Sequence, residues 1–105
     1  PLPCLQFHKG KRHYQIALSD ILFLHSDHVY VEIHTLHHQK ILCRSPLKCL
    51  LAQLPAEQFV QTHRSYIVNL QHVSRLEKDA LYVRDTPIPI SRSRRKAVLA
   101  SLYDD

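Results

Sequence analysis

The sequence has a single glycine among its 105 residues. Glycine-rich phosphate loops and the GxSxG turn of many hydrolases need backbone conformations that only glycine adopts easily. Neither motif is present, and no pair of carboxylates stands in a setting that suggests acid–base chemistry. These absences predict that the chain is not an enzyme.

The cysteines are few and irregularly spaced. Cys4, Cys43 and Cys49 are odd in number and form no CxxC motif, which excludes a disulfide framework and a zinc ribbon. We therefore expect a reducing, cytoplasmic location. Because Cys43 and Cys49 lie in apolar runs, both are predicted to be buried, inert thiols.

Long apolar runs and a signal-peptide pattern are also missing. The longest apolar stretches, such as Ile21 to Leu24, are too short to span a bilayer, so we expect a soluble protein without a membrane partner. Pro1-Leu2-Pro3 is typical of a linker end. No receiver-type aspartate cluster is present, and we expect any receiver or other signalling domain to lie elsewhere, N-terminal to this one.

The composition is that of one globular domain, with 45% hydrophobic and 22% charged residues. Its net charge of +5 and pI near 9.3 favour an acidic partner, although an anionic membrane surface would satisfy the same balance. We expect residues 1–12 to form a linker end and the first strand and turn, and residues 13–105 to form the functional domain.

Alternating apolar residues predict a mainly β fold. The segment 5–18 is typical of a hairpin, and Val29, Val31, Ile33 and Thr35 mark one face of a strand that follows the tip 25–28. Ile41 to Arg44 is expected to return beside it after a turn at residues 37–39. Later strands are predicted at 66–70, 73–76, 80–83 and 86–90, the last at an edge because of its prolines. A turn at residues 77–79 should join the middle two.

Two segments show helical spacing instead. Ser45 followed by Pro46 is typical of a helix cap and first turn, and Leu47, Leu50, Leu51 and Leu54 predict an amphipathic helix of about nine residues that covers a sheet. A short C-terminal helix is predicted from Ser93 to Tyr103. It is expected to place Val98, Leu99, Leu102 and Tyr103 at helical spacing.

Two runs carry the strongest functional signal: HRSYIVNL at 63–70 and IPISRSRR at 88–95. Arg64 stands before an apolar strand that can hold it for a base or phosphate contact. Arg92, Arg94, Arg95 and Lys96 cluster where the last helix should begin, although cations oppose the helix dipole there. Bound phosphate would reverse that effect.

These runs, in the order ILFLHSDHVYVEIHT, RSPL, FVQTHRSYIVNL and IPISRSRRKAVLASL, resemble the LytTR family of DNA-binding domains over residues 13 to 102. The resemblance implies an elongated antiparallel β fold that reads successive major grooves of double-stranded DNA through loops. It also implies a transcription regulator of two-component type, bound as a pair of protomers to direct repeats.

The family's DNA contacts come from three loops, which correspond here to the segment before Val29 and to residues 63–65 and 91–94. The resemblance therefore implies DNA contacts from Arg64 first, then Arg92, Ser93 and Arg94, with His28, His63, Arg95 and Lys96 as further candidates. Where the family often carries an acid followed by a glycine-asparagine tip, this chain has His25-Ser26-Asp27-His28-Val29, so the contact there is left open. Asn69 is expected to bond to backbone inside the fold.

Other interpretations remain at this point. One alternative is a salt bridge from Arg64 to Glu57 or Asp85, and another is that the basic cluster forms only a solvated face. Nine histidines, of which His25, His28, His34, His37 and His38 lie on one predicted hairpin, favour a metal-binding or metal-sensing module as the alternative function. Their spacing matches no standard site, and we predict neither a metal nor a cofactor.

Overall fold

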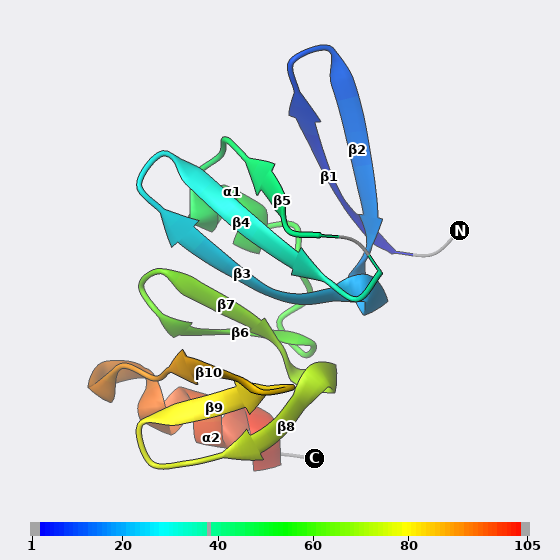
Figure 1. Ribbon diagram of the computed structural model, residues 1–105. Helices are drawn as coiled ribbons and strands as arrows, with labels where there is room; N and C mark the ends of the chain where they lie inside the picture. Colours follow the sequence, from blue (N-terminus) through cyan, green and yellow to red (C-terminus); the bar gives the residue numbers. More distant parts are fainter. Residues whose placement is uncertain (1–2, 38, 104–105) are drawn as a thin grey trace.

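The computed structural model describes residues 3–37 and 39–103. Pro1, Leu2 and His38 fall outside these ranges, and so do most of the expected linker and the centre of the expected 37–39 turn. Within the described ranges the chain forms antiparallel strands with two α-helices, as the mainly β prediction required (Figure 1).

A five-stranded sheet forms the centre, with strand order β5-β4-β3-β7-β6. Its members are β3 (Ile21–Asp27), β4 (Tyr30–Thr35), β5 (Ile41–Cys43), β6 (Phe59–His63) and β7 (Tyr66–Asn69). The middle strand β3 is apolar without alternation at Ile21 to Leu24, and all four residues are buried. A strand covered on both faces needs no polar side.

One face of this sheet packs on the N-terminal hairpin and the first helix. The hairpin is β1 (Cys4–Lys9) paired with β2 (Arg12–Ala17), and the helix is α1 (Leu47–Leu51). Leu5, Ile16, Leu24, Ile33 and Leu50 belong to the shared core cluster. Residues 4–12 therefore contribute a strand to the core.

The opposite face packs on a C-terminal unit of three strands and a helix. The strand order is β10-β9-β8, with β8 (Val73–Leu76), β9 (Ala80–Val83), β10 (Thr86–Pro89) and the helix α2 (Arg95–Tyr103). Leu22, Phe23, Val68, Leu81 and Val98 form the second core cluster. The edge position of β10 and the turn between β8 and β9 are confirmed.

The prediction for the first helix is wrong in two respects. Pro46 has ψ of 143° and occupies the N-cap position, and no side chain caps the helix, so Ser45 is not the cap. The α-helix has five residues, not nine, because hydrogen bonds from Gln53 N–H to Leu50 O and from Leu54 N–H to Leu51 O tighten the chain after it. Leu47, Leu50 and Leu54 are nevertheless buried against the sheet.

Two other expectations need correction. Cys43 is buried, and burial raises the pKa of its thiol, but Cys49 is exposed because it faces away from the sheet on α1. The strand after the first tip begins at Tyr30, one residue later than predicted.

Asn69 is fully buried, as expected. Its Nδ2 donates to Leu18 O at 3.1 Å and to Ile21 O at 2.8 Å, and its Oδ1 accepts from Gln71 N–H at 3.0 Å. The amide thus joins the end of β7 to the start of β3. This confirms the assignment of Asn69 to the fold.

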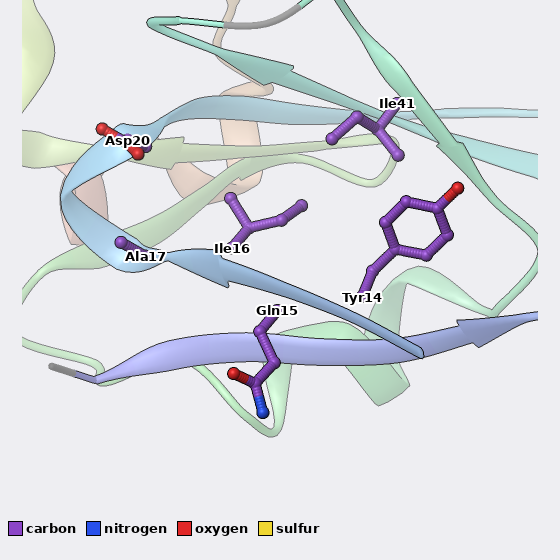
Figure 2. A pocket seen from close by; sticks show the side chains of 6 residues that line it. All are labelled: Tyr14, Gln15, Ile16, Ala17, Asp20 and Ile41. Atoms are coloured by element: carbon purple, nitrogen blue, oxygen red, sulfur yellow. The ribbon is translucent and has the colours of Figure 1, made fainter. Parts of the chain in front are cut away.

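An apolar hollow of about 360 Å³ lies between β2 and β5. Figure 2 shows Tyr14 and Asp20 at opposite ends of it, with Ile16 and Ile41 between them and Gln15 directed away. Tyr14 and Asp20 are its titratable lining residues. They provide no nucleophile and base in contact, so this hollow supplies no catalytic arrangement.

Candidate nucleic-acid interface

Three segments that are distant in sequence meet at one edge of the molecule: residues 27–30, 63–66 and 91–96, here called the loop edge. A backbone hydrogen bond of 2.8 Å from Ser26 N–H to Ser65 O joins the first segment to the second. Another of 2.8 Å, from Ser91 N–H to Thr62 O, joins the second to the third. In Figure 1 the strand tips lie above one another on the left side.

Arg64 occupies the tip of the turn between β6 and β7. The turn is fixed by Ser65 N–H, which donates to His63 Nδ1 at 3.2 Å, and by Gln61 Nε2, which donates to Arg64 O at 3.4 Å. The Arg64 side chain is exposed and forms no ion pair with any acid among residues 3–37 and 39–103. The alternative bridge to Glu57 or Asp85 is therefore not formed.

His63 shapes this turn. Because its Nδ1 accepts a backbone N–H, the neutral ring carries its proton on Nε2. Its edge contacts Tyr66 with ring centroids 6.0 Å apart, and Tyr66 stacks on His25 at 4.2 Å. The backbone around Arg64 thus rests on a row of three aromatic rings. This support limits the conformations that the turn can adopt.

The sequence predicted the basic cluster at the start of the last helix, but the cluster begins in the turn that precedes this helix. Arg92–Arg94 form a 3₁₀ turn, closed by Arg94 N–H donating to Ser91 O at 3.0 Å, and α2 starts at Arg95 rather than Ser93. Arg92, Ser93 and Lys96 are exposed, whereas Arg94 and Arg95 are half-buried.

No acid compensates these cations. The first turn of α2 contains none, and the cluster forms no ion pair in the part of the chain that the structure describes. Each cation near a helix start costs about 0.3 to 1 kcal/mol. Folding alone thus gives no reason for the cluster, which an anionic partner would stabilise.

His28 lies at the tip of the turn between β3 and β4. Its φ of 56° is left-handed, a region that favours glycine or asparagine but that histidine also enters. Its side chain is 94% exposed and lies 3.7 Å from Asp27. The position without the family's glycine therefore keeps a left-handed turn and projects an imidazole into solvent.

Sequence reasoning missed one cation near this edge. The turn 77–79 carries the exposed Lys78 and lies on the same side as the other tips in Figure 1. A hydrogen bond of 2.9 Å from Ile90 N–H to Asp79 O holds it beside the start of the third segment. Only the pairing of β9 with β10 brings Lys78 close to the third segment. The sequence contains no signal for this pairing.

The side-chain hydroxyls of Thr62 and Ser91 lie beneath the last two segments. Both are buried and have no hydrogen-bond partner within residues 3–37 and 39–103. A buried hydroxyl without a partner costs about 1–3 kcal/mol. These two groups show that the junction of β6 with the basic segment is not optimised for stability.

The histidine-rich hairpin uses its imidazoles in pairwise contacts. His34 Nε2 lies 3.2 Å from Glu32 Oε1, His25 Nδ1 lies 3.6 Å from the same oxygen, and His37 lies 3.6 Å from Asp20. Among the described residues no group of three or more His, Cys, Asp or Glu side chains is arranged to hold a metal ion; His38 is outside them. The metal-binding alternative gains no support.

Burial and hydrogen bonding shift two pKa values in this hairpin. Burial lowers the pKa of His34, and the nearby Glu32 carboxylate only partly offsets this effect. Burial opposes ionisation of Glu32, but hydrogen bonds from His34 and Lys40 outweigh it and lower the pKa of that carboxyl. Neutral His34 beside ionised Glu32 is thus the favoured state at neutral pH.

Cationic loops gather at one edge of an antiparallel sheet, an arrangement that suits the binding of an anionic polymer. The family model of the LytTr DNA-binding domain matches residues 11–102. The chain belongs to this family.

No helix in the described ranges is long and apolar enough to cross a membrane.

Two relatives with longer chains share the sequence. An uncharacterized response regulatory protein of Vibrio cholerae is 32% identical over 98 residues, covering 85% of this chain and 37% of the relative. The CO-responsive transcriptional regulator RcoM of Rhodospirillum rubrum is 35% identical over 86 residues, covering 75% of this chain and 36% of the relative. The chain thus spans little more than a third of these relatives.

A solved structure shares the fold. It is the LytTr DNA-binding domain of a Bacillus cereus protein assigned as a methyl-accepting/DNA response regulator. The TM-score is 0.78 over 100% of both chains, at 17% identity. At this identity the match shows the fold and nothing finer.

Proposed function

We propose that this LytTR domain reads specific sequences of double-stranded DNA through its loop edge, as the output domain of a bacterial two-component transcription regulator. The observation that carries the proposal is the meeting of three distant segments at one edge, each with cationic or imidazole side chains directed outward. A solvated basic face would require no such convergence, nor a turn held as firmly as that of Arg64.

The roles follow from exposure. Arg64 is the primary base reader, because a guanidinium binds guanine O6 and N7 through two hydrogen bonds, and its side chain is free of acids. Arg92, Ser93 and Arg94 contact DNA from the third segment, with His28 and His63 as additional donors. Arg95 and Lys96 bind phosphate beside the start of α2. These contacts would place the tips in successive major grooves.

The remaining partners are inferred from the family and the relatives. Two protomers would occupy direct repeats, with half-sites separated by about 10–10.5 base pairs or a multiple, because equal faces of the duplex recur at that interval. A receiver or other signalling domain N-terminal to this one would supply control in the cytoplasm. The names of the relatives, a response regulatory protein and a transcriptional regulator, support this arrangement.

Selection from a random duplex library, with EDTA present throughout, tests the proposal. It predicts an enriched direct-repeat motif, and EDTA should not prevent enrichment because no metal takes part. Failure to enrich any motif would reduce the loop edge to a nonspecific basic patch. Enrichment only after zinc replaced EDTA would instead support the metal-dependent alternative.

A further inference from the structure

The tip between β3 and β4 exposes apolar surface without a structural use. Val29 and Tyr30 are 59% and 41% exposed, and they account for two of the three exposed large hydrophobic residues in the described part of the chain. Both stand beside His28 at an edge that is otherwise polar and basic. Exposed apolar residues grouped in this way mark contact surfaces.

Strand pairing brings a cation to the same place. The register of β4 with β5 matches Val31 with Cys43 and Glu32 with Leu42, so the next position places Arg44 opposite Tyr30. A hollow of about 380 Å³ opens there, and its lining defines what we call the tip surface: Ser26, His28, Val29, Tyr30, Arg44, Ser45 and Pro46. Arg44 itself is exposed.

Charge on the tip surface favours an anion. Arg44 forms no ion pair with an acid of residues 3–37 or 39–103. Asp27 is the acid beside the tip, and its carboxylate lies 3.7 Å from His28 Nε2 and forms no ion pair with Arg44. The guanidinium of Arg44 therefore remains available.

The tip surface continues the loop edge at the scale of a DNA groove. In the order β5-β4-β3-β7-β6, the turn of β3 with β4 and the turn of β7 with β6 are two strand positions apart. At about 4.8 Å per position the tips lie about 10 Å apart, and a major groove is about 12 Å wide. Val29 thus lies close enough to Arg64 for both to contact one duplex.

We propose that two further residues of the tip surface take part in reading the same duplex: Val29 packs against the C5-methyl group of a thymine, and Arg44 binds a backbone phosphate. This inference rests on the proposed function. It adds an apolar base contact to the cationic ones, and it assigns a role to Arg44 in the segment between β5 and α1.

The test replaces each thymine of the selected duplex by deoxyuridine, which removes only the methyl group. One substitution should weaken wild-type binding about fourfold, the value for one buried methyl, and the same substitution should leave the Val29→Ala variant unaffected. Arg44→Gln should reduce the slope of log K against log salt by about 0.9, as expected for one lost phosphate contact. Arg84→Gln is the matched control, because Arg84 is exposed in the turn between β9 and β10, at the opposite end of β9 from the turn 77–79.

Folding should not confuse the result, because Val29, Arg44 and Arg84 are exposed and unchanged melting temperatures can verify it. Equal deoxyuridine sensitivity of wild type and Val29→Ala would overturn the methyl contact. Equal slopes for Arg44→Gln and Arg84→Gln would overturn the phosphate contact. If these two contacts were overturned while Arg64→Gln lost its sequence preference, this inference alone would fail; if selection gave no motif, both proposals would fall.

Discussion

Replacement of Asn69 by leucine tests how the end of β7 is held to the start of β3. The side chain is fully buried and forms three hydrogen bonds, to Leu18 O, Ile21 O and Gln71 N–H. Each buried hydrogen bond contributes about 1 kcal/mol net, so Asn69→Leu should lower the free energy of unfolding by about 3 kcal/mol. Leucine has the same number and branching of side-chain heavy atoms as asparagine, so the replacement leaves no cavity.

Urea denaturation followed by circular dichroism measures the decrease in the free energy of unfolding directly. At about 4–8 °C per kcal/mol for a domain of this size, the melting temperature should fall by about 12–24 °C. Gln71→Ala is the control, because the exposed side chain is removed while the backbone donor remains; it should change stability by less than about 0.5 kcal/mol. A loss below about 1 kcal/mol for Asn69→Leu would refute the role assigned to its amide.

Three further predictions concern binding and pH. Arg64→Gln should lower affinity for the selected duplex by about 1–3 kcal/mol while random duplex is bound nearly as before; equal losses in titrations of both duplexes would exclude base reading. Arg95→Ala and Lys96→Ala should each reduce the salt slope by about 0.9 with little change in specificity, and an unchanged slope would assign them to a solvated face. Burial lowers the pKa of His34 below its ordinary 6.5, so the unfolded chain binds more protons and stability should decrease as pH falls below about 6.5. The lowered pKa of Glu32 acts in the same direction at lower pH. His34→Gln should flatten the dependence of unfolding free energy on pH between about 7.5 and 5.5; an identical curve would contradict burial as the cause.

Elements with a regular pattern were predictable from the sequence. The strands at Val73–Leu76 and Ala80–Val83 have the expected bounds, because apolar residues alternate or run together between clear turn signals. The first helix was overestimated, since leucine spacing continues through tight turns that hold the same face without α-helical hydrogen bonds. Cys49 shows that an apolar neighbourhood in sequence does not fix which side of a helix a residue takes.

The site was predictable in its segments but not in its arrangement. The runs around Arg64 and Arg92 stand out by charge, and the family resemblance connects them. The position of Arg44 opposite Tyr30, and of Lys78 near the third segment, depends on strand register and pairing. These are long-range properties that local patterns do not contain.

Titration of the selected duplex and a scrambled duplex of equal composition, each at two salt concentrations, tests the central claim most directly. Sequence reading through the loop edge predicts binding to the selected duplex tighter by about 10³-fold or more, with a preference that persists as salt weakens both complexes. Equal affinities that disappear together at the higher salt concentration would contradict it, and would show that the loop edge binds charge alone.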